Sequence, residues 1–354
     1  MTATVASYLG AAQHRPRPLP LFLSMLRSET ADAPERQADA LRGLRAYQQA
    51  ERPPAPPPMP VVAEAGRARV RDYGGSGPPV LFVPSLINPP DILDLDEERS
   101  LLRWLATQNV RPLLLDWGSP RPEERDLSIG GHIETMLLPL IDTLGTDVAL
   151  AGYCLGGTMA LAAASLRPAR SLTLIAAPWH FANYPGEMRA ALADLWHQAE
   201  PATDALGVLP MEVLQAAFWR LDPKRTIAKY EAFGRREADE VASRAFVRLE
   251  DWANDGPPLT RGAARELMLD LYLDDRSGKG SWQVGGRVID PAALGCPVLE
   301  IVSTSDRIVP AASAAGIGER IDLALGHVGM IVSKRAKAAL WEPLAAALSR
   351  PQRS

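Results

Sequence analysis

The sequence predicts an α/β protein with a mostly parallel, doubly wound sheet and a helical insertion. Short apolar runs alternate with helical patterns between residues 80 and 176, which is the order that a parallel sheet with crossover helices requires. Within this part, residues 148–161 form a buried strand, a very tight turn and a helix. The strand pattern then stops and resumes at residues 297–302. The functional site of such a sheet lies at the carboxyl ends of its strands.

Each strand is predicted from a short apolar run, and each helix from apolar residues at helical spacing. The predicted strands are 61–62, 68–73, 80–83, 112–116, 148–151, 171–176 and 297–302. The predicted helices of this part are 99–108, 129–144, 158–166 and 336–348. A Gly-Gly-Ser-Gly sequence at 74–77 supplies the turn between the second and third strands.

Residues 1–60 are predicted to form a helical N-terminal arm with a proline-rich linker. An apolar run at 21–26 precedes a charged, weakly amphipathic helix at 34–50, and this helix opens on a proline, which suits a first helical turn. Residues 53–60 are mostly proline, as in a stiff extended connector. This linker places the main α/β domain at 61–350.

Between about residues 179 and 285 the alternation of strands and helices stops. Five of the chain's 8 tryptophans fall in this segment, among helical apolar clusters. An insertion at this place would form a lid that excludes water and shapes a substrate site. A second helical subdomain without a gating role is the alternative, and the sequence leaves both open.

The tight turn has the sequence Gly-Tyr-Cys-Leu-Gly-Gly at 152–157. It matches the nucleophile elbow pattern G-x-S-x-G, with Cys154 in the position of the serine. Glycines are needed because strand and helix nearly touch at such a strained turn. The following helix directs its N-terminus at the sulfur and favours a thiolate. The alternative is a buried structural cysteine, but the strand, turn and helix around Cys154 favour a nucleophile.

A nucleophilic cysteine needs a base and an acid that orients the base. In folds with an elbow, the order along the chain is nucleophile, acid, histidine. His327 lies in a glycine-flanked loop before the last predicted helix, and Asp306 directly follows the strand at 297–302. Cys154, Asp306 and His327 therefore satisfy both the order and the topology of a triad.

Other residues compete for these roles. His180 follows a predicted strand and could approach the site in a binding or lid role, whereas His132 begins a helix and is expected to be structural. His197 is expected to be a helical lid residue. Asp322 is close to the catalytic histidine candidate in sequence but does not follow a predicted strand, and Cys296 opens a strand where a small apolar residue suffices.

An oxyanion hole requires two backbone N–H groups. The first is expected from Leu155, the residue after the nucleophile. The second is expected from the loop after the strand at 80–83, with Ile87 as the choice. Each donor of this kind contributes roughly 3 kcal/mol to stabilisation of the transition state.

The composition excludes several classes of function. A net charge of −4 gives no electrostatic case for binding nucleic acid or an anionic membrane. The sequence contains no paired cysteine or histidine motif for a metal and no glycine-rich dinucleotide motif, so no metal and no resident cofactor is expected. The uncharged run 148–166 has the length of a membrane span, but its glycines favour a buried strand and helix. Two cysteines and the lack of a secretory signal indicate a cytoplasmic location.

The choice of cysteine bears on the reaction. A thiolate that attacks an oxygen ester must form a less stable thioester. A thiolate that attacks a thioester forms another thioester of similar stability. A cysteine elbow therefore favours an acyltransferase that uses coenzyme A thioesters, with hydrolysis as the alternative.

The sequence also resembles a known family. The segment GYCLGG (152–157) resembles the G-x-C-x-G-G box of polyhydroxyalkanoate synthases. Further similar segments are LINPPDILDL (86–95), DWG (116–118), GCPVL (295–299), SDRIVP (305–310) and GHVGMIVS (326–333). They cover about residues 80–348 in the family's order, and the chain length is most similar to the short, class III synthases.

The resemblance implies an α/β-hydrolase fold, a Cys154–Asp306–His327 triad and polymerisation of 3-hydroxyacyl coenzyme A on the cysteine. In that family the histidine activates the cysteine, and the aspartate is thought to help activate the incoming hydroxyl group. The resemblance further suggests a separate partner subunit, a homodimer and a place at the surface of polyester granules. Two alternatives stay open: a cysteine-dependent esterase, thioesterase or polyester depolymerase, and a non-enzymatic platform on a granule or partner.

Overall fold

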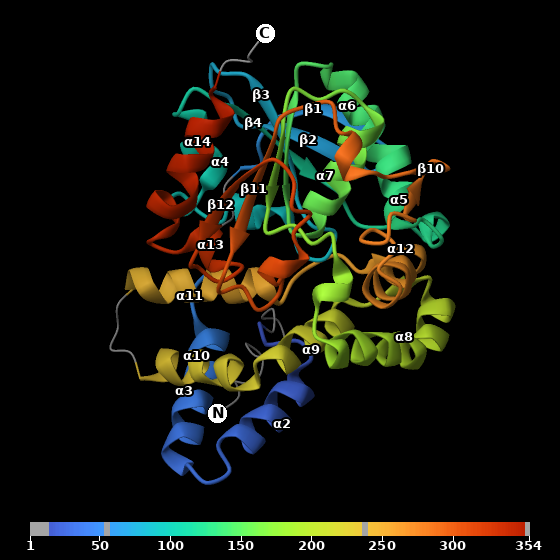
Figure 1. Cartoon of the computed structure of the whole chain (residues 1–354). Helices are drawn as coiled ribbons and strands as arrows, with labels where there is room; N and C mark the ends of the chain where they lie inside the picture. The colour runs from blue at the N-terminus through green and yellow to red at the C-terminus, as the bar shows by residue number, and fades with distance from the viewer. Residues whose placement is uncertain (1–13, 53–56, 236–239, 351–354) are drawn as a thin grey trace. The chain divides into compact units, whose positions relative to one another are not determined.

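A computed structural model of the chain describes residues 14–52, 57–235 and 240–350 (Figure 1). The chain divides into two compact units. Unit 1 comprises Met1–Ala55 and Glu212–Asp255, and unit 2 comprises Pro56–Met211 and Gly256–Ser354. The first part of the predicted proline-rich linker, residues 53–56, lies outside the described residues, as do residues 1–13 of the predicted arm.

Unit 2 is built on an eight-stranded sheet with the order β1-β2-β4-β3-β5-β6-β11-β12. The strands are β1 (Val61–Ala65), β2 (Ala68–Asp72), β3 (Pro79–Val83), β4 (Arg111–Asp116), β5 (Ala149–Tyr153), β6 (Leu172–Ile175), β11 (Val298–Ser303) and β12 (Glu319–Leu323). The strands from β4 to β12 pair in parallel, and β1 and β2 are antiparallel. The predicted mostly parallel sheet is confirmed.

The central strands are buried on both faces, which explains their continuous apolar sequences. Figure 1 shows helices on either side of the sheet. On one side lie α4 (Leu101–Ala106), α13 (Gly329–Val332) and α14 (Glu342–Leu348), and on the other α5 (Ile129–His132), α6 (Leu138–Leu144) and α7 (Leu155–Leu166). The sheet is therefore doubly wound.

Two predicted helices and one helical stretch of the predicted lid segment contain π-helical turns. The predicted helix 129–144 consists of α5, a π-helical segment (Ile133–Leu137) and α6. A second π-helical segment, Lys337–Trp341, precedes α14. A third, η5 (Glu266–Leu273), follows α12 (Arg261–Arg265) in the segment predicted as a lid. Such wide turns interrupt the regular 3.6-residue period and are often found at functional sites.

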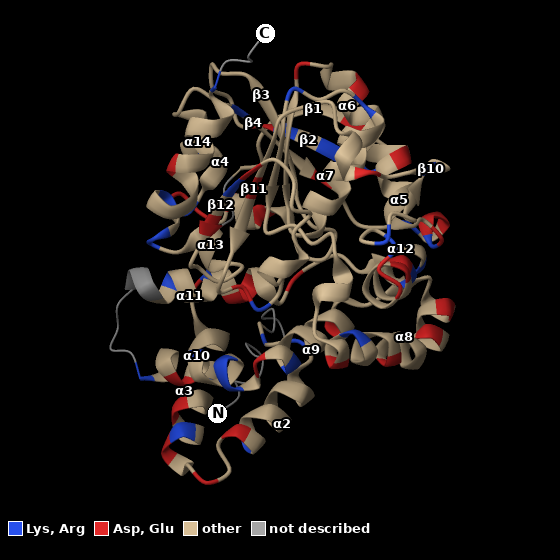
Figure 2. Cartoon of the chain, viewed as in Figure 1, with Lys and Arg blue, Asp and Glu red and all other residues tan. Residues whose placement is uncertain are grey.

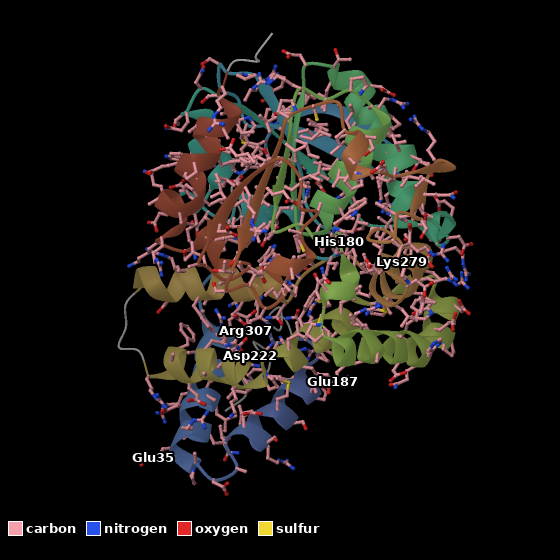
Figure 3. All side chains as sticks on the ribbon, viewed as in Figure 1. Glu35, His180, Glu187, Asp222, Lys279 and Arg307 are labelled. Atoms are coloured by element: carbon pink, nitrogen blue, oxygen red, sulfur yellow. The ribbon has the colours of Figure 1, made fainter. Side chains whose placement is uncertain are left out.

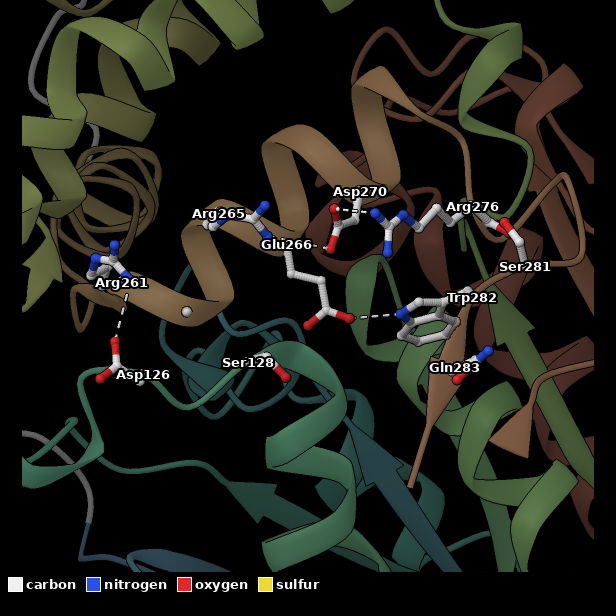
Figure 4. A pocket seen from close by; sticks show the side chains of 11 residues that line it. Asp126, Ser128, Arg261, Arg265, Glu266, Asp270, Arg276, Ser281, Trp282 and Gln283 are labelled. Atoms are coloured by element: carbon white, nitrogen blue, oxygen red, sulfur yellow. Dashed lines mark hydrogen bonds and ion pairs between the residues drawn. The ribbon is translucent and has the colours of Figure 1, made fainter. Parts of the chain in front are cut away.

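The buried carboxylate of Glu266 fixes the start of η5 in unit 2 (Figure 4). Its Oε1 accepts a hydrogen bond from Trp282 Nε1 at 2.6 Å, and its Oε2 accepts one from the Gly130 N–H at 3.1 Å. Gly130 belongs to α5, and Trp282 lies between η5 and β11. This single side chain therefore joins η5, α5 and the segment that follows η5. The cavity beside it has a volume of about 440 Å³ and is lined mainly by charged and polar residues.

Unit 1 has a separate hydrophobic core. Its helices are α2 (Leu19–Glu29), α3 (Pro34–Gln49), α10 (Pro223–Gly234), α11 (Glu240–Ala253) and most of α9 (Met211–Leu221). Two helices of the predicted arm thus pack with helices that the sequence assigned to the lid segment. Phe22 and Tyr230 meet edge to face in this core, at a centroid distance of 4.8 Å.

Close contact of α3 and α10 depends on two glycines. A Cβ atom on Gly43 would lie 2.0 Å from the carbonyl oxygen of Tyr230, and one on Gly234 would lie 2.0 Å from that of Asp39. Only glycine leaves room for the two backbones at this crossing.

The remaining helix of the predicted lid segment is α8 (Gly186–Leu206), which belongs to unit 2. Acidic and basic residues are interspersed along the helices, whereas the central strands carry few of them (Figure 2). Among the described residues, no helix has the length and the apolar character needed to cross a membrane.

Candidate active site

Cys154 lies between β5 and α7, at the carboxyl end of a central strand. Its φ and ψ are 57° and −132°, a conformation that costs free energy for any residue with a side chain. Its N–H donates to the Ile175 carbonyl of the neighbouring strand at 3.0 Å. The side chain is partly exposed, as a nucleophile must be and a packing residue need not be.

The three glycines of the motif allow this turn. A Cβ on Gly152 would lie 2.4 Å from Gly157 Cα, and one on Gly156 would lie 2.1 Å from the Val83 carbonyl oxygen. A Cβ on Gly157 would approach that of Ala177 to 2.3 Å. Strand β3, strand β5 and helix α7 therefore meet where no side chain fits, which is the crowding that the sequence motif predicts.

His327 and Asp306 form a buried pair. His327 Nδ1 lies 2.6 Å from Asp306 Oδ2, and the Asp306 side chain is 0% exposed. The other carboxylate oxygen, Oδ1, accepts the N–H groups of Ile308 and Val309 at 2.8 and 3.0 Å. Both oxygens of Asp306 are thus occupied, and the carboxylate holds the imidazole ring in one orientation.

Cys154 completes this group. Burial on its own would lower the pKa of His327, but the charge on Cys154, hydrogen bonds to Asp306 and Cys154, and the charge on Asp306 raise it to about 10. The structure therefore brings all three predicted triad residues together. A protonated His327 beside the sulfur stabilises a thiolate.

The residue before the nucleophile supports the histidine. The Tyr153 ring stacks on the His327 ring with a centroid distance of 5.0 Å, and its hydroxyl donates to the His327 carbonyl oxygen at 3.2 Å. The Ser303 hydroxyl donates to the carbonyl oxygen of Leu325, two residues before His327. Strands β5 and β11 thereby fix the loop that carries the histidine. The sequence predictions missed both residues, although Tyr153 stands inside the motif.

The two predicted oxyanion donors come from different segments of unit 2. Leu155 is the first residue of α7, where an α-helix leaves N–H groups without intrahelical acceptors. Ile87 lies in the loop after β3, and its N–H donates to the Ser85 hydroxyl oxygen at 3.1 Å. An oxyanion at this amide would have to replace or share the Ser85 oxygen, so the role of Ile87 stays a prediction.

The competing residues have other surroundings. His132 is buried, where its Nδ1 lies 2.7 Å from the Ser128 carbonyl oxygen and its Nε2 lies 2.7 Å from Arg67 Nη2, in keeping with a structural role. His197 is exposed on α8. Asp322 is exposed on β12 and binds Arg320.

His180, labelled in Figure 3, lines a different cavity of about 460 Å³ with residues of the 277–292 segment. Cys296 is partly exposed, and burial raises the pKa of its thiol, which makes it a poor nucleophile at neutral pH. A binding role for His180 stays a prediction. Among the described residues, no cluster of three His, Cys, Asp or Glu side chains could hold a metal.

Two further aromatic residues close to Cys154 were not predicted. Tyr184 follows β6, and Tyr272 lies on η5. The charge on Cys154 contributes to a raised pKa of both phenols, after burial as the larger cause. Lone tyrosines among helical apolar residues carry no spacing signal, so only the folded chain reveals their position.

Several curated proteins are similar to this chain. The poly(3-hydroxyalkanoate) polymerase subunit PhaC of Thiocystis violacea is 31% identical over 278 residues, which cover 73% of this chain and 77% of that protein. The PhaC subunit of Synechocystis sp. is 30% identical over 296 residues, covering 77% of this chain and 78% of that protein.

The PhaC subunit of Haloferax mediterranei is 30% identical over 74% of this chain. This chain spans only 57% of that relative's length and 63% of the length of the Haloarcula marismortui relative. No family model matches the sequence.

Solved structures show the fold. An epoxide hydrolase from Bacillus megaterium matches with a TM-score of 0.52 and 16% identity, over 80% of this chain and 99% of that one. A thermophilic esterase from Thermogutta terrifontis matches with a TM-score of 0.50 and 16% identity, over 82% of this chain and all of that one, 100%. The predicted α/β-hydrolase fold is confirmed. From its sequence relatives, the chain belongs to the family of poly(3-hydroxyalkanoate) polymerase PhaC subunits.

Proposed function

We propose that the protein is an acyltransferase that polymerises 3-hydroxyacyl groups from coenzyme A thioesters, with Cys154 as the covalent carrier. The observation that carries this proposal is the thiol on a strained elbow beside His327, which is paired with the buried Asp306. The polymerase names of the relatives support the choice of substrate.

In the first step the Cys154 thiolate attacks the carbonyl carbon of the coenzyme A thioester. A bond forms between carbon and the cysteine sulfur, the bond to the coenzyme A sulfur breaks, and the imidazolium of His327 gives its proton to the leaving thiolate. The N–H groups of Leu155 and Ile87 are the proposed donors to the oxyanion. The product is an acyl thioester on Cys154 and a neutral imidazole.

In the second step the hydroxyl group of another 3-hydroxyacyl unit attacks this thioester. His327 takes the hydroxyl proton, a carbon–oxygen ester bond forms, and the carbon–sulfur bond to Cys154 breaks. The site returns to thiolate and imidazolium. Atoms and charges balance without any metal or redox partner, so no cofactor other than the coenzyme A thioester substrate is required.

The surroundings of Asp306 favour an orienting role over that of a base. One of its oxygens binds His327, the other accepts two backbone N–H groups, and its side chain has no exposed surface. A substrate hydroxyl would have to displace one of these partners to reach the carboxylate. In this proposal His327 therefore accepts the proton in the second step.

Hydrolysis is the competing outcome, because water could replace the hydroxyl in the second step. The purified protein is incubated with 3-hydroxybutyryl coenzyme A, and released thiol, free acid and polymer are measured. Release of thiol together with polymer is expected from wild-type protein. A Cys154→Ala variant should release at least 10³-fold less thiol, and a Cys296→Ala variant should match the wild type.

Release of thiol with monomeric acid alone would contradict the polymerase and favour a thioesterase. A Cys154→Ser variant separates the two functions further. A serine nucleophile supports ester hydrolysis well. It forms an oxygen ester, which exchanges acyl groups with coenzyme A thioesters poorly, so retained hydrolysis in this variant would favour the hydrolase. Equal and slow alkylation of Cys154 and Cys296 by iodoacetamide would instead indicate a non-enzymatic platform.

A partner subunit, a homodimer and a place at granule surfaces are also proposals, suggested by the family resemblance, and a cytoplasmic location is a proposal that rests on the two cysteines and the lack of a secretory signal. Mixing the protein with and without a candidate partner subunit in the same assay would show whether the chain polymerises alone.

A further inference from the structure

The segment after β6 brings an aromatic group to the edge of the sheet where Cys154 lies. Strand β6 pairs in parallel with β5, so both strands end at the same edge. The Thr158 hydroxyl of α7 donates to the Pro178 carbonyl oxygen at 2.6 Å, which fixes the start of this segment beside the elbow. Phe181, Tyr184 and Tyr272 then pack together, with centroid distances of 4.9 to 5.8 Å.

The hydroxyl group of Tyr184 is the unusual feature of this cluster. The residue is 3% exposed, yet its hydroxyl has no hydrogen-bond partner of acceptable geometry among the described residues. It lies near the hydroxyls of Tyr272 and Ser313, but Ser313 directs its own proton to the Pro310 carbonyl oxygen at 2.7 Å. A buried polar group without a partner destabilises a fold, so its presence calls for an explanation.

The second tyrosine is held in place from both sides. Tyr272 lies on the π-helical segment η5, whose first residue is tied to α5 and to Trp282. Arg189 of α8 donates to the Tyr272 carbonyl oxygen at 2.7 Å. The cluster is therefore fixed in position before any ligand binds, as a binding site should be.

Both phenols lie within electrostatic range of Cys154. Burial raises the pKa of Tyr184 and of Tyr272, and the charge on Cys154 raises it further, so both hydroxyls are protonated donors at neutral pH, as an ordinary tyrosine also is. Any acyl group bound to the Cys154 sulfur would lie in the same region.

We propose that Tyr184 and Tyr272 form a subsite that binds the 3-hydroxyl group of the acyl chain on Cys154, with the Tyr184 hydroxyl as the hydrogen-bond donor. The subsite rests on the proposed acyl transfer and adds to it the residues that select the substrate. It accepts acyl groups with a hydroxyl on the third carbon and discriminates against unsubstituted chains of the same length. The ligand supplies the partner that the Tyr184 hydroxyl lacks in the free protein.

Such a contact holds the acyl chain on Cys154 in one orientation, so that its thioester carbonyl is presented to the hydroxyl group of the next unit in the second step. A pocket built to bind a hydroxyl rejects an analogue without one, since the buried tyrosine then stays unpaired.

The first test measures selectivity at the acylation step. Wild-type, Tyr184→Phe and Tyr272→Phe proteins are each mixed with 3-hydroxybutyryl or butyryl coenzyme A, quenched with acid, and analysed by intact mass for acyl groups on Cys154. Tyr184→Phe is expected to lower the rate ratio of hydroxylated to plain substrate by about 10-fold or more. Tyr272→Phe should lower the same ratio to a smaller extent.

The second test measures stability without substrate. Because the Tyr184 hydroxyl is unpaired, Tyr184→Phe should leave the melting temperature equal to or above that of the wild type. The matched control is Tyr73→Phe, since the Tyr73 hydroxyl is also buried in unit 2 but donates to Asp94 at 2.9 Å. This control should lower the melting temperature and leave the substrate ratio unchanged.

Three results would overturn the subsite. An unchanged ratio in Tyr184→Phe, or an equal loss with both thioesters, would show that the hydroxyl does not recognise the substrate. A fall in melting temperature as large as that of Tyr73→Phe would show a structural role. Wild-type protein that acquires no acyl group from either thioester would contradict the proposed acyl transfer itself, and with it the subsite.

Discussion

We expect the buried His132 to make the stability of the protein depend on pH. Burial lowers the pKa of this histidine to about 4 from an ordinary value of 6.5, and the nearby Arg67 also lowers it. The neutral ring fits its neighbours, since one nitrogen can donate to the Ser128 carbonyl while the other accepts from Arg67. A protonated ring would place a second cation beside the arginine.

The unfolded chain therefore binds a proton at His132 at a higher pH than the folded chain does. The free energy of unfolding should fall as the pH decreases from about 6.5 towards 4, with a loss on the order of 2 kcal/mol at pH 5 from this residue. A His132→Gln variant should show a flatter dependence in urea titrations between pH 7 and 5. Parallel curves for the two proteins would contradict this assignment.

The catalytic candidates could be found from sequence because each has a position that topology defines. Cys154 stands in a glycine motif, Asp306 directly follows a strand, and His327 lies in a loop before the last helix. Tyr184 and Ser303 could not be found in this way. Their roles depend on side-chain contacts between segments that are distant in the chain, and neither stands in a pattern that requires its type.

At the level of the elements, most strands and helices followed the apolar pattern, and the exceptions have physical reasons. Strand β12 was not predicted, because its sequence Glu-Arg-Ile-Asp-Leu is polar and most of its residues are not buried. It pairs only with β11, at one edge of the sheet. The π-helical turns were also missed, because one additional residue in a turn changes the period too little to detect.

A Glu266→Gln variant tests how much this one side chain contributes to the position of η5. In a Glu266→Gln variant the amide nitrogen cannot accept a hydrogen bond, so either the Gly130 N–H or the Trp282 indole is left buried without an acceptor. The expected loss in the free energy of unfolding is about 1–3 kcal/mol. Hydrogen exchange should also become faster along η5, the segment that carries Tyr272.

Glu134→Gln is the matched control for this variant. Glu134 accepts the Gly285 N–H at 2.6 Å but is exposed to solvent, so the amide oxygen of the glutamine or a water molecule can still accept this N–H. Its substitution should change stability by less than about 0.5 kcal/mol. Similar losses in the two variants would show that burial of the Glu266 carboxylate does not matter.

At the scale of the whole molecule, the chain contains two cores. Unit 1 encloses its own cluster of aromatic and aliphatic side chains, whereas the sheet and the candidate triad belong entirely to unit 2. The sequence pointed to a proline-rich boundary after the N-terminal helices. It could not show that these helices pack with α10 and α11, because the close approach of α3 to α10 depends on the surroundings of two glycines, and the contact with α11 depends on side chains that are distant in the chain.

Gly43 allows the two cores to be tested separately. In a Gly43→Ala variant the new methyl group would overlap the Tyr230 carbonyl oxygen, a backbone atom that cannot move without displacing α10. Overpacking of this kind costs about 1–3 kcal/mol. Hydrogen exchange measured by mass spectrometry should become faster in α2, α3 and α10.

Because the triad and its sheet lie within unit 2, alkylation of Cys154 by iodoacetamide in this variant is expected to keep its wild-type rate. The control is Gly186→Ala at the start of α8, where no atom lies within 4 Å of the new Cβ and exchange should not change. Faster exchange throughout the central sheet of the Gly43→Ala protein would mean that the two units unfold as one, and that the core around Tyr230 also stabilises the elbow.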